Sequence, residues 1–176
     1  MIREAIINSL VHRDYSINSP NYLEIYDDKV IITNPGGLMR EIKIKDLYQE
    51  HKSILRNPHI AKSLFLAGYI EQWGLGTLNM IREMLMNDLS LPLFETEDYF
   101  FKVILMMEKS KKDEKYIKAI KFIQRKKEIK TQELAKHLKL SERETRRVLN
   151  FLESLKLIKR EGKTKNARYI FSANSD

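Results

Sequence analysis

The stretch from Ser141 to Leu152 reads Ser-Glu-Arg-Glu-Thr-Arg-Arg-Val-Leu-Asn-Phe-Leu, and it carries two side-chain patterns with one spacing. The first is a mostly apolar set at i, i+3, i+4 and i+7, namely Thr145, Val148, Leu149 and Leu152. The second begins two residues earlier and consists of Arg143, Arg146, Arg147 and Asn150. At ~100° per residue, the two sets lie on nearly opposite sides of a helix. The stretch therefore predicts a helix that packs on a core with one side and presents arginines and an amide on the other.

The residues before this stretch predict two further helices. Tyr116–Ile123 has apolar side chains at helical spacing, and a second periodic segment begins at Thr131. Ser141 and Glu144 have the spacing of a capping box, in which each side chain accepts a hydrogen bond from the backbone N–H of the other residue. We therefore expect the third helix to begin at Ser141.

Two strand-like segments follow the third helix. Leu157–Arg160 and Arg168–Phe171 are joined by a basic turn over residues 161–166. Three helices followed by such a hairpin resemble the winged helix-turn-helix family, and the resemblance covers residues 115–176. It implies that the third helix enters the major groove of double-stranded DNA and that the hairpin, or wing, lies along the DNA backbone.

The resemblance also assigns DNA contacts to individual residues. Arginine can pair bidentately with guanine, and an amide such as that of Asn150 can pair with adenine or bond a phosphate. Basic residues of the wing are expected to contact phosphates, which position the protein without reading sequence. The expected DNA-binding residues are Ser141, Arg143, Arg146, Arg147, Asn150, Lys163, Lys165 and Arg168. The alternative is a solvated basic face on a module that binds an acidic protein.

Charge separates the two ends of the chain. Residues 1–108 hold 11 Lys and Arg against 15 Asp and Glu, a net charge of −4, whereas residues 109–176 hold 21 against 9, a net charge of +12. Only the second part is therefore expected to meet a polyanion. Cysteine is absent, which excludes disulfides and thiolate metal sites. With no signal peptide and no apolar run long enough to cross a bilayer, we expect a cytoplasmic protein without a membrane partner.

The first 108 residues predict a two-layer α/β sandwich. Apolar periodicity predicts helices over 2–11, 57–66 and 78–87, and a short amphipathic segment over 42–48. Two β-rich runs, 22–26 and 30–33, predict a hairpin, and 99–107 predicts a strand buried on both faces. Residues 91–94 are expected in a loop. The apolar side of the first helix is expected to consist of Ile6, Ile7, Leu10 and Val11.

Glu4 and Asn8 lie four residues apart, which places both side chains on one face of the first helix. The pair resembles the Glu-x-x-x-Asn helix of the GHKL ATPases, the gyrase, MutL and histidine-kinase superfamily. The resemblance implies Glu4 as the catalytic base that activates water and Asn8 as a Mg²⁺ ligand. Two glycine pairs stand where the family has its glycine boxes, and N–H groups at such a helix start can bind phosphate. The implied ATP-binding residues are Asn8, Asn34, Gly36, Gly37, Gly74 and Gly76.

Two departures from the GHKL pattern bear on ATP chemistry. Asn34, followed by Pro35, stands where the family has an Asp that reads adenine, and the second glycine box is short. These departures argue against ATP turnover and leave the binding of ATP and Mg²⁺ open. The expected fold class is α+β, with an incomplete GHKL-like sandwich over 1–108, a polar linker over 109–114 and a winged helix-turn-helix over 115–176.

Four motifs in order give a broader resemblance over the first domain. They are Arg3–Tyr15, Asn34–Leu38, Arg56–Pro58 and Trp73–Gly76. Together they resemble the Schlafen/Alba-type transcriptional regulators described as "ATP-dependent DNA helicase RecG-related". No Gly-x-x-x-x-Gly-Lys-Ser/Thr loop is present, so strand separation is not expected. The triplet His12-Arg13-Asp14 is expected to tie the end of the first helix to the hairpin.

The sequence favours a DNA-binding transcriptional regulator, with a winged helix that binds double-stranded DNA and an α/β domain that senses a signal or forms a homodimer. A GHKL-type ATP-binding protein or ATPase coupled to DNA binding is the first alternative. A protein-interaction module is the second. The four histidines lack the spacing of metal ligands, so a zinc site is not expected.

Overall fold

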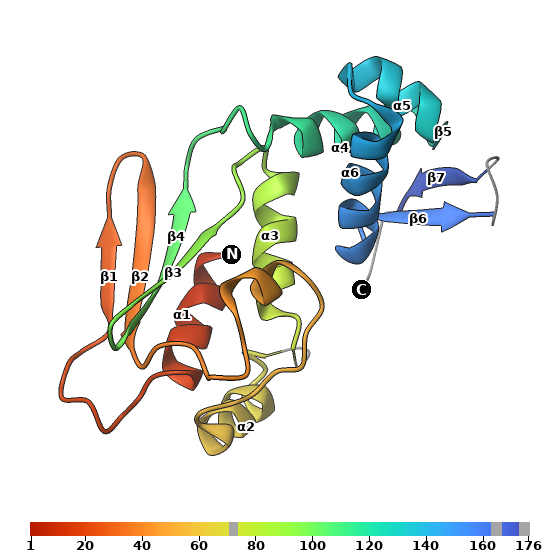
Figure 1. Cartoon of the computed structure of the whole chain (residues 1–176). Coiled ribbons are helices and arrows are strands. Elements are labelled where there is room, and N and C mark those ends of the chain that lie inside the picture. The colour runs from red at the N-terminus through yellow and green to blue at the C-terminus, as the bar shows by residue number, and fades with distance from the viewer. Residues whose placement is uncertain (71–73, 163–166, 173–176) are drawn as a thin grey trace. The chain divides into compact units, whose positions relative to one another are not determined.

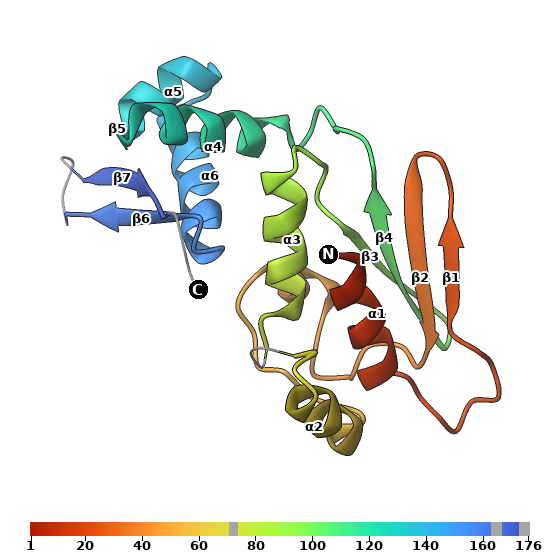
Figure 2. The same ribbon diagram turned by 180° about the vertical axis from the view of Figure 1, so that it is seen from behind.

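The computed structural model describes residues 1–70, 74–162 and 167–172. The chain divides into Met1–Glu108, here called unit 1, and Lys109–Asp176, here called unit 2. Figures 1 and 2 show the elements of both units from opposite sides. The fold is mixed α+β, as predicted, with one antiparallel sheet in each unit. Among the described residues, no helix has both the length and the apolar character needed to cross a bilayer.

Unit 1 is a four-stranded antiparallel sheet with helices on one face. The strands have the order β1-β2-β4-β3 in the sheet, and their bounds are Tyr22–Ile25, Lys29–Pro35, Leu93–Glu97 and Phe100–Met106 for β1 to β4. The helices α1, α2 and α3 and the 3-10 helix η1 span Ile2–Val11, Pro58–Leu66, Gly76–Met86 and Ile44–Tyr48. Helices α1 and α3 pack on each other, and α1 packs on β2. The two views agree on this layering.

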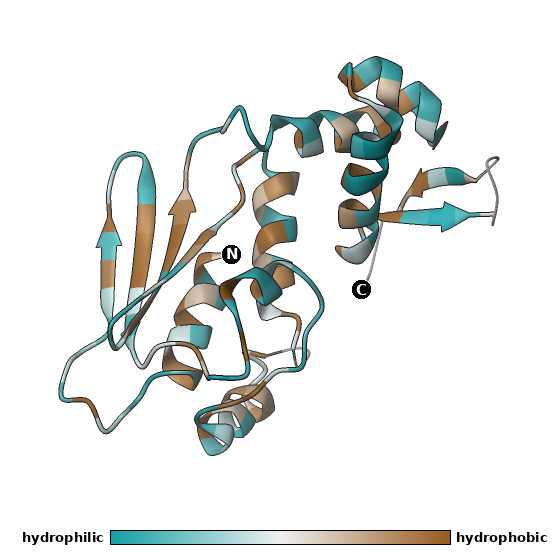
Figure 3. Cartoon of the chain, viewed as in Figure 1, coloured by the Kyte–Doolittle hydropathy of each residue, from teal (hydrophilic) through white to brown (hydrophobic). Residues whose placement is uncertain are grey.

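The core of unit 1 lies between this sheet face and the helices. In the register of β2 and β4, Ile32 pairs with Val103 and Val30 with Leu105, and all four side chains are buried. Figure 3 shows the hydrophobic stretches of β2 and β4. Helix α3 contributes Leu78, Met80, Ile81, Met84 and Leu85. The alternation of apolar side chains along β2 and β4 thus fixes which sheet face the helices cover.

Helix α1 has the predicted bounds and half of the predicted apolar side, since Ile7 and Val11 are buried. Leu10 is 37% exposed and Ile6 is partly exposed, whereas Ala5 and Ser9 are buried. The helix packs against β2, α2 and α3, so it is covered on more than one side. The small side chains of Ala5 and Ser9 allow these neighbours to pack closely against α1. The hydroxyl of Ser9 donates to the carbonyl oxygen of Ile6 at 2.7 Å, which satisfies that buried polar group.

Two predictions for the last strands of unit 1 were wrong. Leu93 and Phe94 were expected in a loop but begin β3, directly after Pro92. Proline has no N–H for a ladder, so the strand begins just past it. Strand β4 was expected to be buried on both faces, yet full burial is confined to Val103 and Leu105. Within the described part of unit 1, the helices lie on the other side of the sheet, so the side chains on the opposite face of β4 stay partly exposed.

Unit 2 contains the three predicted helices and the predicted hairpin. Helices α4, α5 and α6 span Glu114–Lys126, Thr131–Leu138 and Glu142–Ser154. Strands β5, β6 and β7 span Glu128–Lys130, Ile158–Glu161 and Arg168–Phe171, and they form an antiparallel sheet in the order β5-β7-β6. Strand β5 was not predicted, because three residues are too few for a periodic signal. Helix α4 begins at Glu114, the last residue of the predicted linker.

The capping box of α6 is formed as predicted. The hydroxyl oxygen of Ser141 accepts from the backbone N–H of Glu144 at 3.3 Å, and the Glu144 carboxylate accepts from the backbone N–H of Ser141 at 3.2 Å. The Ser141 hydroxyl also donates to that carboxylate, and these bonds lower the pKa of Glu144. The predicted core side is confirmed, since each of its members is at most 2% exposed: Thr145, Val148, Leu149 and Leu152.

Candidate functional site

A cavity of about 110 Å³ lies within unit 1. It is lined by residues from α1, from the end of β2 and the loop after it, from the segment before α2 and from the start of α3. The lining includes every residue that the sequence assigned to a nucleotide site: Glu4, Asn8, Asn34, Gly36, Gly37, Gly74 and Gly76. Residues as far apart in sequence as Glu4 and Gly76 therefore meet at one place.

Glu4 and Asn8 meet the start of α3 across this cavity. The side-chain amide of Asn8 donates to Oε1 of Glu4 at 3.2 Å. A Cβ atom at Gly76 would collide with Oε1 of Glu4 and lie 2.8 Å from Nδ2 of Asn8. Glycine at this position therefore allows the first turn of α3 to approach α1. The N–H groups of that turn lack intrahelical partners and carry the positive end of the helix dipole.

Thr77 adds an unsatisfied polar atom to the same wall. Its Oγ1 atom is buried and has no hydrogen-bond partner in the described part of the chain. The residue lines the cavity next to Gly76. An unpaired hydroxyl beside free helical N–H groups is suited to an oxygen-rich ligand group such as a phosphate.

The loop after β2 forms the opposite wall, and Asn34 holds it in shape. Asn34 is 2% exposed, and its Nδ2 atom donates to the carbonyl oxygens of Pro35 and Gly36 at 3.1 and 3.5 Å. Gly36 has a φ of +94°, a conformation that side chains disfavour, and its N–H donates to the carbonyl oxygen of Tyr99. The two carbonyls fix the orientation of the Asn34 amide, so its Oδ1 atom is the one left for other contacts.

An ion pair that the sequence analysis did not assign closes this wall. The guanidinium of Arg56 lies 3.2 Å from Oδ2 of Asp14 and donates to the carbonyl oxygen of Gly37 at 2.8 Å. It also packs against Gly36, where a Cβ would collide with Nη1. The motif around Arg56 was visible in the sequence. The partner Asp14 is 42 residues away, and no local spacing connects the two.

The triplet at the end of α1 ties that helix to its neighbours, as predicted. The N–H of Asp14 donates to the carbonyl oxygen of Pro35 at 2.8 Å, which joins the helix end to β2. The side chain of Asn57 donates to the carbonyl oxygens of Val11 and Arg13 at 2.9 and 2.7 Å, which satisfies the open end of α1. These bonds place His12 on the wall of the cavity.

Two titratable groups near this wall have altered pKa values. Burial, followed by the positive charge of Arg56 and by His51, lowers the pKa of His12 to about 4. The His12 imidazole is therefore uncharged near neutral pH. Hydrogen bonds from the hydroxyl and the backbone N–H of Ser16 lower the pKa of Asp14, and Arg56 contributes in the same direction.

The donor set of the cavity bears on the predicted Mg²⁺ site. The described residues contain no group of three or more His, Cys, Asp or Glu side chains that could hold a metal ion. Asn8 uses Nδ2 toward Glu4, so its Oδ1 oxygen is the atom that suits a hard cation. Magnesium commonly takes one or two protein oxygens together with phosphates and water. The residues fit such an ion only as part of a phosphate complex.

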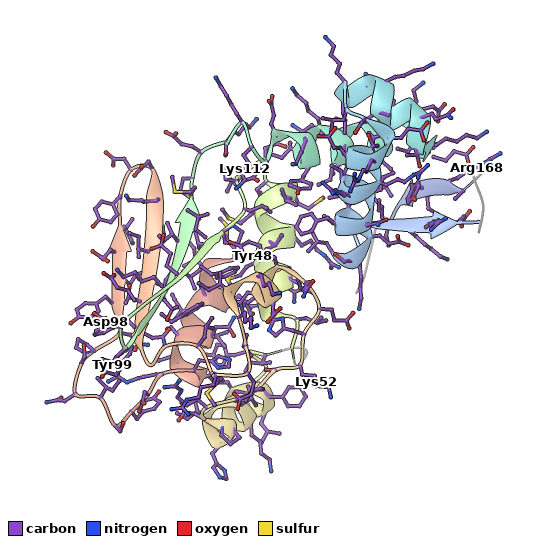
Figure 4. The ribbon with its side chains drawn as sticks, viewed as in Figure 1. Tyr48, Lys52, Asp98, Tyr99, Lys112 and Arg168 are labelled. Carbon is purple, nitrogen blue, oxygen red and sulfur yellow. The ribbon has the colours of Figure 1, made fainter. Side chains whose placement is uncertain are left out.

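In unit 2, the predicted DNA-binding side chains of α6 are exposed on the side opposite its core stripe. Figure 3 shows alternating hydrophilic and hydrophobic bands along this helix. Two predicted residues are ion-paired: Nη2 of Arg146 lies 3.1 Å from Glu142, and Nη1 of Arg168 lies 2.7 Å from Glu128. Arg168 is labelled at the start of β7 in Figure 4. Lys163, Lys165 and Trp73 lie outside the described residues.

Comparison with known proteins identifies part of the chain. Residues 19–105 match the family model of the putative ATP-dependent DNA helicase recG C-terminal. Residues 19–105 of unit 1 are thus similar to a RecG C-terminal, ATPase-type domain. The match confirms the RecG-related, GHKL-like part of the predicted resemblance. It begins after α1, so Glu4 and Asn8 stand outside the matched range of the RecG C-terminal-like domain.

A solved structure shares the fold. The DIP2311 protein from Corynebacterium diphtheriae matches with a TM-score of 0.59 at 17% sequence identity, over 97% of this chain. The chain spans 38% of the length of that protein. No curated protein matches the sequence. At this level of identity the likeness concerns the fold alone.

Proposed function

We propose that this protein binds double-stranded DNA through unit 2 and acts as a transcriptional regulator. The observation that carries the proposal is the two-sided helix α6, which buries four side chains and exposes arginines on its opposite side. In the order of its helices and hairpin, unit 2 resembles a winged helix-turn-helix, with α6 as the helix that enters the major groove. The net charge of +12 for residues 109–176 supports a polyanionic partner.

The ion pairs of unit 2 rank the proposed DNA contacts. Arg143 and Arg147 form no ion pair with a described residue, so their guanidinium groups are available to phosphates or guanine edges. Arg146 and Arg168 must first leave Glu142 and Glu128. We infer that Arg143 and Arg147 contribute most of the affinity. Arg146 and Arg168 contribute less, because part of their interaction with DNA replaces an existing pair.

The proposal is tested by mobility shift of the full chain with duplex DNA fragments. We expect retarded bands with random-sequence DNA, and tighter binding to a subset of genomic fragments. Replacing Arg143 and Arg147 with alanine should weaken binding to random-sequence DNA and to the genomic fragments. If duplex DNA gives no shift at low salt while an acidic protein is retained on the same arginines, unit 2 is a protein-interaction module instead.

A second function is favoured by the cavity of unit 1, which gathers the predicted nucleotide-site residues and carries the unpaired hydroxyl of Thr77. We propose that it binds a nucleotide with Mg²⁺, with the phosphates at the start of α3. Asn8 would be the protein ligand of the ion and Glu4 the base beside the attacking water. Calorimetry with Mg-ATP tests the proposal. Binding heat that is lost in Asn8→Ala supports it, and no heat from the wild-type chain excludes it.

The two proposals together suggest a regulator in which unit 1 senses a nucleotide and unit 2 binds DNA. A relation to Schlafen/Alba-type regulators is part of this proposal; the match of residues 19–105 supports its RecG-related part. We also propose a homodimer, since winged helices commonly bind two half-sites. Sedimentation of the full chain with and without DNA tests the dimer. A monomer on a single half-site would contradict it.

A further inference from the structure

Strand β1 is an open edge of the unit 1 sheet. Among the described residues it pairs only with β2, and Figures 1 and 2 show it at the end of the sheet. The other edge strand, β3, carries two glutamates, follows a proline and contacts η1. Charges, proline and covering elements are devices that keep a sheet edge from pairing with another chain. Strand β1 has no proline and a single charged residue, Glu24, and all four of its residues are exposed.

The backbone of β1 offers two residues to a further strand. The N–H of Tyr26 donates to the carbonyl oxygen of Lys29 at 2.8 Å, so these residues form a hydrogen-bonded pair across the hairpin. The bonding direction alternates along an antiparallel pair, so Glu24 also points its backbone groups toward β2. Leu23 and Ile25 point theirs to the free edge, where no described residue bonds to them.

The same two residues carry apolar side chains that the helices leave uncovered. Leu23 pairs with Ile32 and Ile25 pairs with Val30, and Ile32 and Val30 are buried. Paired residues point to the same face of a sheet, so Leu23 and Ile25 point to the face on which the helices lie. Even so, Leu23 is 51% exposed and Ile25 is 74% exposed. Strand β1 therefore lies beyond the part of the sheet that the helices cover.

Helix α1 borders this uncovered part with further apolar side chains. Helix α3 meets α1 at Glu4 and Asn8, on the side that faces β3 and β4 across the cavity. Ile2 and Leu10 stand two residues before Glu4 and two after Asn8, which at ~100° per residue places them on the opposite flank, toward β1. Each is 37% exposed. The strip formed by these apolar side chains is here called the β1 edge strip, and it consists of Ile2, Leu10, Leu23 and Ile25.

We propose that a second copy of this chain occupies the β1 edge strip, with the two β1 strands antiparallel about a two-fold axis at Glu24. Leu23 of each copy then lies opposite Ile25 of the other, and each such pair exchanges two N–H···O bonds. A register shifted by two residues would instead place Leu23 or Ile25 opposite a residue outside β1. The outward groups of β1 thus match a second β1, as a two-fold interface requires. The inference rests on the proposed homodimer and assigns its interface.

The joined sheets bring the two β1 edge strips together. Helix α1 packs on β2, so the α1 helices of the two copies stand about three strand spacings apart, ~14 Å. Helices in direct contact are ~8–10 Å apart, so a shallow gap lies between them above the paired β1 strands. The apolar side chains of both strips fill this gap. The pairing therefore covers the side chains that a single copy leaves exposed.

Glu24 limits the strength of this pairing. It points to the other face of the sheet, where it faces Glu24 of the second copy, and like charges directly opposite each other destabilise a sheet. The hydroxyl of Tyr26 donates to Oε1 of Glu24 at 3.0 Å, which stabilises the carboxylate within each chain. We expect a dimer that dissociates on dilution. Glu24→Gln should tighten it about twofold to fivefold, the usual range for a cross-strand pair.

The test is sedimentation of the full chain over a range of concentrations. Ile25→Lys places a charge in the strip of each copy and should weaken association at least about tenfold. Ile25→Pro removes the outward N–H while the bonds of β1 to β2 remain, and it should weaken association about tenfold or more. Leu66→Lys, on α2, is the matched control, because Leu66 is 74% exposed, as Ile25 is. It should associate as the wild type does.

The outcomes separate the interface from the homodimer itself. Association of wild-type strength in both Ile25 variants overturns the interface and leaves the homodimer in place. A wild-type chain that stays monomeric at every concentration, with and without duplex DNA, overturns both and leaves the edge to a strand of another protein.

Amide hydrogen exchange of the unaltered protein covers the case in which the variants do not fold. The N–H groups of Leu23 and Ile25 should exchange more slowly in concentrated than in dilute protein. The N–H of Glu24, which points toward β2, is the internal control and should change less. Equal exchange of Leu23 and Ile25 at both concentrations contradicts the proposal.

Discussion

Unit 1 and unit 2 place their functional side chains in opposite ways. Unit 1 directs polar groups inward, onto a cavity whose walls come from several segments that are far apart in sequence. Unit 2 carries its exposed arginines on one continuous helix, whose other side forms the core. A substitution in the cavity therefore alters packing and binding together. A substitution on the exposed side of α6 is expected to alter the proposed DNA binding and to leave the fold intact.

Gly36→Ala should give the largest effect on unit 1. The residue has a φ of +94°, and a Cβ would collide with Arg56 and lie 2.9 Å from Cβ of Asp14. Backbone strain of ~1–2 kcal/mol and overpacking of ~1–3 kcal/mol predict a loss of about 3 kcal/mol in unfolding free energy. Urea denaturation measures it. Gly68→Ala is the control, since Gly68 has a φ of +75° with no atom within 4 Å, and it should lose the backbone contribution alone. Equal losses of unfolding free energy in both variants would show that the contact of the new Cβ with Arg56 adds nothing to the destabilisation.

The pH dependence of unit 1 stability should follow His12. Its pKa in the folded state is about 4, below the ordinary 6.5, so the unfolded chain binds more protons between these values. The stabilisation is complete above pH 6.5 and is lost as the pH falls toward 4. At ~1.4 kcal/mol per pH unit, the loss of unfolding free energy approaches about 3 kcal/mol.

Denaturation between pH 7 and 5 excludes the carboxylates with lowered pKa values, such as Asp14 and Glu144, which titrate below that range. Burial also lowers the pKa of the Met1 amine, so the comparison with His12→Phe assigns the slope. In His12→Phe the stability should change little over the same interval. If the unfolding free energy of His12→Phe changes with pH as steeply as that of the wild type, the titrating group is not His12.

Ser141→Ala should have a smaller effect, confined to unit 2. The substitution removes the side chain that caps α6 and frees the N–H of Glu144, at a cost of about 1 kcal/mol. Thermal unfolding followed by circular dichroism measures it. Ser154→Ala, in the last turn of the same helix, is the control: its hydroxyl bonds only the carbonyl oxygen of Phe151 and no helix start depends on it. Ser154→Ala should lose less stability than Ser141→Ala.

The same contrast explains which features the sequence could predict. The start of α6, its buried side and the pairing of Glu4 with Asn8 all follow from spacing within one helix, and the structure has each of them. The contact of Arg56 with Asp14 joins residues 42 positions apart and depends on how the walls of the cavity meet. Burial of Ala5 and Ser9 likewise depends on neighbours that no local pattern describes.

The two ion pairs of unit 2 show the same difference between a contact set by local spacing and a contact between distant residues. Glu142 and Arg146 stand at i and i+4, a spacing from which their pairing could have been predicted. Glu128 and Arg168 meet only because β5 pairs with β7, and β5 was too short to be predicted. Under the proposed DNA binding, both pairs lower the affinity that can be expected from arginine content alone.

The central claim, that the unpaired arginines of α6 bind DNA, is tested most directly by the salt dependence of affinity. Fluorescence anisotropy with labelled duplex DNA would compare the wild type with Arg143→Ala/Arg147→Ala and with Arg146→Ala. If both residues contact phosphates, the double variant should bind more weakly and show a log–log salt slope smaller by about 1.8, which is ~0.9 for each lost contact. The paired Arg146 should change the slope by less than either of them. An unchanged affinity and slope in the double variant would contradict the account.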